Sequence, residues 1–133
     1  MSALPDIAAW RDAAARNAGL FEALDPGARI GLVARADSAR MLLWEVGAAG
    51  VDARVAAFEG YTSCGADMLL SADAGSMARI ADAVGGDLFT ALRMDIRSGG
   101  VVCYMLRRRC DLEARGFDEL LDALGFAFMG ACR

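Results

Sequence analysis

Acidic residues come closest to forming a chemical site in this sequence, because several of them occur near one another. Asp118 and Asp122 stand four residues apart in a segment with helical spacing, so both side chains would point the same way. Asp67 and Asp73 are also close in the chain. Paired carboxylates can act as general acid and base, but such pairs are far more often part of an ordinary solvated helix face. Acids in predicted strands, such as Asp67 and Asp95, usually face water. The acids alone therefore predict no catalytic residue.

Two residue types that carry much enzyme chemistry are missing. The sequence contains no His and no Lys, and all 14 of its basic residues are Arg. Without histidine, neither a Ser-His-Asp or Cys-His site nor a zinc site with imidazole ligands can form. Without lysine, Schiff-base chemistry is excluded. Carboxylate pairs and arginine-assisted electrostatics remain possible, so a non-enzymatic function is favoured.

The cysteines do not form a metal or redox motif. Cys64, Cys103, Cys110 and Cys132 are separated by 39, 7 and 22 positions, whereas zinc ribbons and dithiol motifs need pairs two to four residues apart. We expect free, mostly buried thiols in a reducing compartment. We also expect no cofactor and no tightly bound zinc or iron.

Charge and hydropathy limit the partners that the chain can have. The net charge is −4 and the isoelectric point about 4.7, which disfavours nucleic acid. The basic run 107–109 is more typical of a solvated strand end, or of ion-pair partners for nearby acids, than of a phosphate site. Asp6 and Asp12 interrupt the first apolar stretch, so it is not a signal peptide. No uncharged run is long enough for a membrane span. We expect a cytoplasmic protein.

Hydrophobic periodicity predicts an α+β fold in a single domain, 1–133: one mainly antiparallel curved sheet of four to six strands with helices packed on one side. The helices are expected at 5–24, 73–84 and 111–124. Strands are expected at 28–36, 40–46, 51–57, 66–71 and 92–96, with a hairpin turn at 37–39. The segment 101–106 is either the return strand of a second hairpin or the start of a helix, and a strand is favoured.

An apolar binding site is predicted from the chain end and the methionines. Phe126, Phe128 and Met129 follow the last expected helix, and leaving each in water would forgo about 1.5–3 kcal/mol. They would be buried in the domain's own groove, against a partner subunit or against a ligand. Methionines on predicted apolar faces suit an adaptable pocket. The expected ligand-binding residues are Trp44, Met77, Ile80, Val84, Leu92, Met94, Leu121, Phe126, Phe128 and Met129.

The stretch from Ala28 to about Gly100 resembles the sterol-carrier-protein (type 2) family. Trp44, Val46 and Gly47 match its W-x-V-glycine segment, and 66–71 matches a short strand that leads into a helix. A glycine-terminated helix at 77–86 and a strand ending in glycine at 92–99 would follow. The resemblance implies an apolar cavity between sheet and helices that binds lipid without catalytic residues and is closed by the C-terminal segment. The chain departs from the pattern after Gly100.

Two other functions stay open. A small acidic α+β chain with a final amphipathic helix also resembles small acidic secretion chaperones, which are homodimers that bind an unfolded segment of a secreted protein. The third reading is an enzyme on an open α+β barrel that uses only carboxylates and arginines. A lipid that co-purifies would favour the first function, and dimerisation with peptide binding the second.

Overall fold

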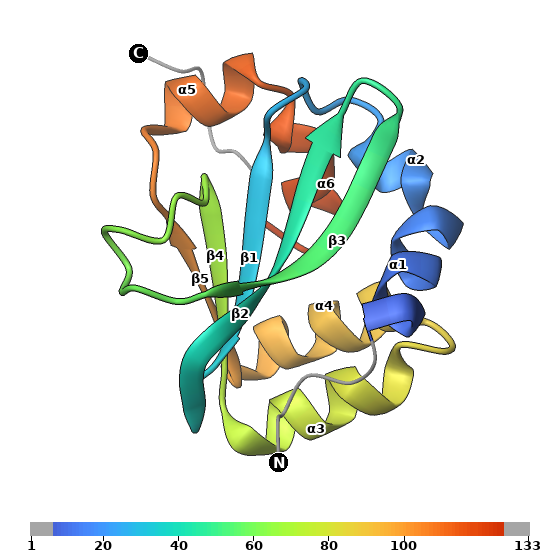
Figure 1. Cartoon of the computed structure of the whole chain (residues 1–133), viewed down its shortest axis with the longest axis vertical. Coiled ribbons are helices and arrows are strands. Elements are labelled where there is room, and N and C mark those ends of the chain that lie inside the picture. Colours follow the sequence, from blue (N-terminus) through green and yellow to red (C-terminus); the bar gives the residue numbers. More distant parts are fainter. Residues whose placement is uncertain (1–6, 127–133) are drawn as a thin grey trace.

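Five strands form one open sheet in the computed structural model, which describes residues 7–126 (Figure 1). The order across the sheet is β3-β2-β1-β4-β5, and every neighbouring pair is antiparallel except β1 and β4, which are parallel. The predicted α+β class and the mainly antiparallel sheet are therefore confirmed. The strands are β1 (Arg29–Ala34), β2 (Asp37–Gly47), β3 (Gly50–Ala57), β4 (Met68–Ala72) and β5 (Val101–Met105).

The helices pack on one face of this sheet, as the sequence predicted. Strand side chains alternate between the two faces, so β2 directs Leu42, Trp44 and Val46 into a main core that includes residues of all six helices. Met41 and Leu43 point to the other face, where a smaller cluster is covered by residues between β3 and β4, among them Phe58. The helices are α1 (Ile7–Arg16), α2 (Ala18–Phe21), α3 (Ala74–Ala83), α4 (Leu88–Ser98), α5 (Arg109–Ala114) and α6 (Phe117–Ala123).

The predicted helices are present, but two of them are divided. The segment expected at 5–24 breaks at Asn17, between α1 and α2, and the segment expected at 111–124 breaks before α6. Asp73 caps α3: its carboxylate accepts a hydrogen bond from the Ser76 backbone N–H at 2.8 Å. Hydrogen bonds from Ser76 lower the pKa of Asp73. The first hairpin is correct in its pairing, although its turn lies at Arg35 and Ala36 rather than at 37–39.

The predicted strand at 92–96 is wrong, because these residues belong to helix α4. The alternation of Leu92, Met94 and Ile96 with charged residues indicated a strand, yet Leu88, Leu92 and Ile96 also repeat at the four-residue step of a helix. Asp87 caps this helix by accepting a hydrogen bond from the Thr90 backbone N–H at 3.2 Å. Met94 therefore points outward and is 66% exposed.

The strand expected at 101–106 is confirmed as β5, but its partner is β4 rather than the segment 92–96. The pair β1 and β4 is parallel, and two helices fill the connection from β4 to β5. On the side of β4 and β5 the sheet is thus assembled from strands distant in sequence. On the side of β2 and β3 it is assembled from local hairpins.

Gly116, between α5 and α6, generates a prediction about stability. Its φ is +84°, and a Cβ added there would overlap the carbonyl oxygen of Ala23. We expect Gly116→Ala to lower the free energy of unfolding by about 3 kcal/mol or more, since it combines left-handed strain with a backbone clash. The measurement is urea denaturation. Gly99→Ala is the control: φ there is +90° with nothing within 4 Å, so strain alone should cost about 1 kcal/mol. Equal losses in the two variants would contradict this account.

Candidate functional site

Six of the residues predicted to bind a ligand lie together in the main core. Trp44, Met77, Ile80, Val84, Leu92 and Leu121 are each no more than 2% exposed. The Trp44 ring packs against the rings of Trp10, Phe21 and Phe89, at centroid distances of 5.9, 6.4 and 6.2 Å. At these positions the space between sheet and helices is thus occupied by packed side chains.

The remaining predicted residues lie elsewhere. Phe126 is partly buried against the core and lines a surface pocket of about 290 Å³ with residues of α4, among them Arg93 and Ile96. Met94 faces outward on α4. Phe128 and Met129 lie outside the described residues. The structure therefore brings six of the ten positions together and places Phe126 at the edge of their cluster.

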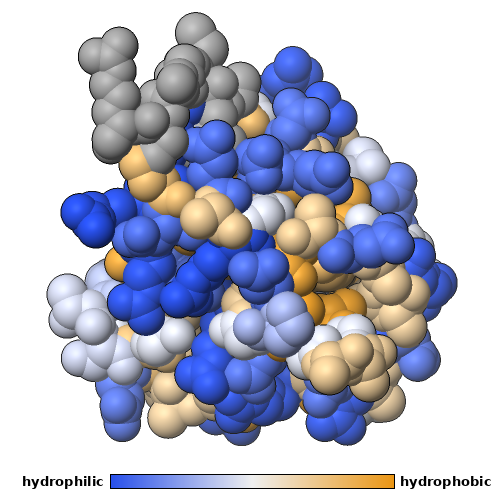
Figure 2. Space-filling view, turned by 90° about the horizontal axis from the view of Figure 1, so that it is seen from above, coloured by the Kyte–Doolittle hydropathy of each residue, from blue (hydrophilic) through white to orange (hydrophobic). Residues whose placement is uncertain are grey.

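A larger pocket opens between α2 and the turn that joins β2 to β3, with a volume of about 540 Å³. We call it the α2 pocket. Figure 2 looks onto this end of the molecule and shows strongly hydrophobic side chains inside a hollow of the surface. Most of the lining residues are apolar in type, but polar groups make up nearly half of the surface that they expose; the residues are Ala18, Gly19, Phe21, Glu22, Leu24, Pro26, Val46, Gly47, Ala48, Ala49, Gly50 and Val51.

The core and small residues together create the α2 pocket. Its floor includes Phe21, Leu24 and Val46, which also belong to the main core. Its walls are low because the β2–β3 turn consists of Ala48 and Ala49 between Gly47 and Gly50. Glycine suits position 50, where φ is +124°.

Backbone hydrogen bonds hold the two walls of the α2 pocket in place. The Gly27 N–H donates to the Val46 carbonyl at 2.7 Å, and the Val46 N–H donates to the Ala28 carbonyl at 2.9 Å. These bonds join the loop after α2 to the end of β2. Main-chain hydrogen bonds thus fix the distance between the loop after α2, which forms one wall, and the end of β2, which leads into the other. The shape of the pocket does not depend on flexible side chains alone.

Binding is the chemistry that this pocket supports. Glu22 is the one charged residue among those lining it, and no cysteine, serine or second carboxylate stands beside it to form a nucleophile or an acid–base pair. The sequence placed Phe21 and Leu24 in an expected helix and left 47–50 as the connection between two expected strands. No pattern in the sequence signalled that this turn would face α2.

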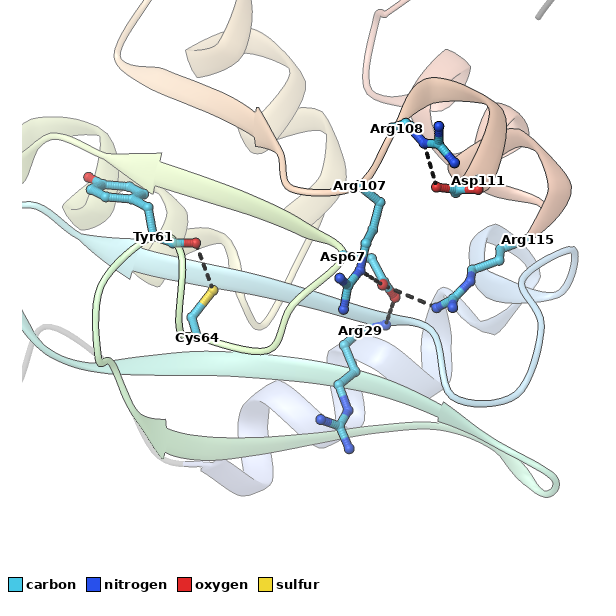
Figure 3. Close-up of polar contacts among 8 residues, drawn as sticks. All are labelled: Arg29, Tyr61, Cys64, Asp67, Arg107, Arg108, Asp111 and Arg115. Atoms are coloured by element: carbon cyan, nitrogen blue, oxygen red, sulfur yellow. Dashed lines mark hydrogen bonds and ion pairs between the residues drawn. The ribbon is translucent and has the colours of Figure 1, made fainter. Parts of the chain in front are cut away.

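A buried carboxylate forms a polar cluster at the edge of the sheet where β1 and β4 begin and β5 ends (Figure 3). Asp67 is 2% exposed, so the expectation that it faces water is wrong. Its Oδ1 accepts hydrogen bonds from Arg107 Nε and Arg115 Nη1, both at 3.1 Å, and its Oδ2 accepts one from the Arg29 backbone N–H at 3.0 Å. We call these four residues the Asp67 cluster.

The Asp67 cluster explains part of the basic run. Arg107 serves as an ion-pair partner for a nearby acid, which is one of the two roles that the sequence favoured. Arg108 pairs more weakly with Asp111 at 3.5 Å, and both side chains are largely exposed. The expectation that Asp95 faces water is also wrong, because it is buried in α4 and pairs with Arg79 at 2.7 Å.

The cysteines differ in state. Cys64 and Cys103 are free, and burial raises the pKa of the Cys103 thiol to about 12. Cys110 is disulfide-bonded, so the prediction of free thiols is wrong at that position, and Cys132 lies outside the described residues.

Within residues 7–126 no group of three or more Cys, Asp or Glu side chains could hold a metal ion. None of the helices there is long and apolar enough to cross a membrane.

Removing the charge of Asp67 should destabilise the fold. In Asp67→Asn two arginines lose their shared anionic partner, and we expect the free energy of unfolding to fall by about 2–4 kcal/mol. Urea denaturation measures this change. The matched variant Asp111→Asn removes one negative charge from an exposed pair and should cost about 1 kcal/mol or less. A loss for Asp67→Asn no greater than that for Asp111→Asn would show that the buried carboxylate contributes nothing special.

Comparison with known proteins adds no assignment for either site. No family model, curated protein or solved structure matches this chain. What the α2 pocket does is therefore inferred from its own residues.

Proposed function

We propose that this protein binds an apolar small molecule or a lipid chain in the α2 pocket and does not catalyse a reaction on it. The observation that carries the proposal is the pocket itself, a hollow of about 540 Å³ between α2 and the β2–β3 turn, lined mainly by residues of apolar type. Its volume falls in the range of about 300–1,000 Å³ that is typical of small-molecule sites. Such sites combine mostly apolar walls with a few polar groups, as this one does.

The placement of the floor supports the proposal. Phe21, Leu24 and Val46 are at most 7% exposed and are held by the main core, so the floor is preformed, although these three side chains present little surface of their own to a ligand. A preformed site reduces the entropy lost on binding. Each methylene group that becomes buried there would contribute about 0.8 kcal/mol.

The secondary structure implied by the resemblance to sterol carrier proteins is found in one part of the chain and not in another. The segment 66–71 does lead from a strand into a helix, since β4 is followed by α3. The segment 92–99, which should be a strand, is helix α4. The class of ligand implied by that resemblance is retained in the proposal, while the site is moved from the core to the α2 pocket. A closing role for the C-terminal segment is not needed.

A second candidate, binding of an extended segment of another protein, is favoured by the outer edge of β5. This strand ends the sheet, and Val102, Tyr104 and Met105 on it are each about 40% exposed. The Tyr104 ring lies 4.7 Å from that of Tyr61, centroid to centroid. An extended peptide can add to such an edge through main-chain hydrogen bonds. This candidate requires a homodimer that binds peptide, which light scattering and peptide titration would reveal.

Filling the α2 pocket should weaken ligand binding without destabilising the fold. Gly19 lines the pocket, and a Cβ there would meet nothing within 4 Å. We expect Gly19→Leu to leave the melting temperature unchanged or higher, because leucine favours a helix more than glycine. The affinity for the uncharged fluorescent probe N-phenyl-1-naphthylamine should fall about tenfold or more, the equivalent of roughly two buried methylenes.

The control for this experiment is Gly85→Leu. Gly85 is exposed, a Cβ there would also meet nothing within 4 Å, and the residue lies beyond α3, away from the pocket lining. The control should bind the probe like the parent protein. If Gly19→Leu also binds it with unchanged affinity, or if the parent protein binds none, the proposed function is wrong.

A further inference from the structure

We propose that the natural ligand of the α2 pocket carries a positive charge at one end, as an alkyl amine or a quaternary ammonium amphiphile does. This inference rests on the proposed function and specifies its ligand class. It follows from the charges around the pocket, which has an acidic group at its rim and no basic residue in its lining.

Glu22 supplies the negative charge. It is exposed at the end of α2 and lines the pocket. Among the described residues it is in none of the ion pairs or side-chain hydrogen bonds found. Its carboxylate is therefore free to meet a cationic group whose apolar part extends over Phe21 and Val46.

Arginines of α1 and of the turn before α6 have partners other than Glu22. Arg11 pairs with Asp52 at 3.3 Å, and Arg16 donates a hydrogen bond to the Val84 carbonyl at 2.6 Å. Arg115 is bound to Asp67. An anionic headgroup, such as that of a fatty acid, would therefore find a carboxylate at the rim and no partner in the lining.

The charge of the whole protein acts in the same direction. The net charge of −4 favours the approach of cations and opposes that of anions, and salt weakens both effects. The apolar floor supplies affinity that is independent of the headgroup. The preference for a headgroup and the affinity for the alkyl chain of the ligand can thus be measured separately.

The test compares three amphiphiles with the same ten-carbon chain, all below their micelle concentrations: decyltrimethylammonium, decan-1-ol and decanoate. Each displaces N-phenyl-1-naphthylamine from the parent protein at low salt. We expect the cation to bind about threefold to fivefold more tightly than the alcohol, which is the size of effect of an exposed ion pair. Decanoate should bind more weakly than the alcohol. Added potassium chloride should reduce both differences.

Glu22→Gln should remove the preference for the cation and leave the affinity for decan-1-ol unchanged. Glu59→Gln is the matched control, because Glu59 is exposed, is not among the residues that line the α2 pocket and loses the same charge. This control should keep the preference. If the alcohol binds but the cation has no advantage, or if Glu22→Gln retains that advantage, the inference is wrong while the proposed function stands. If none of the three amphiphiles displaces the probe, both are wrong.

Discussion

The buried carboxylate of Asp67 is the constraint on which this end of the molecule depends. A charge this far from water is tolerated only if its oxygens are fully hydrogen-bonded. Arg107, Arg115 and the Arg29 backbone N–H meet that requirement. They come from the end of β5, the turn before α6 and the start of β1, so a single side chain fixes three chain segments relative to β4.

The same arrangement extends to the α2 pocket through the main chain. The carbonyl of Arg115 accepts a hydrogen bond from the Asp25 N–H at 3.0 Å. Asp25 lies between Leu24 and Pro26, which both line the pocket. The loop that forms one wall is thus held on one side by the turn before α6 and on the other by β2. The pocket is a consequence of how the helices and the sheet are joined, and large side chains are absent there because glycine and alanine occupy the β2–β3 turn.

Local patterns in the sequence predicted much of the fold and little of the site. The hairpin of β1 and β2, the strand β3 and the helix α3 all depend on residues close in the chain. Periodicity could not tell whether the segment 92–96 is a strand or a helix, because a pattern of five or six residues fits both. The hydrogen-bonded cap at Asp87 marks the start of a helix there. Asp67 was misplaced because its partners lie 38 to 48 residues away. The α2 pocket was missed for the same reason: it forms between segments that meet only in the folded chain, whereas the predicted site residues were large apolar side chains, which fill the core.

The most direct test of the central claim is to locate bound ligand on the protein by amide chemical shifts. A titration of ¹⁵N-labelled protein with N-phenyl-1-naphthylamine should move the amide signals of Gly19, Ala48, Ala49 and Gly50, since these residues line the α2 pocket. Signals of α4 and of the β5 edge should stay in place. Saturable shifts that gather instead at Tyr61 and Tyr104, or at Arg93 and Phe126, would contradict the assignment of the α2 pocket as the binding site.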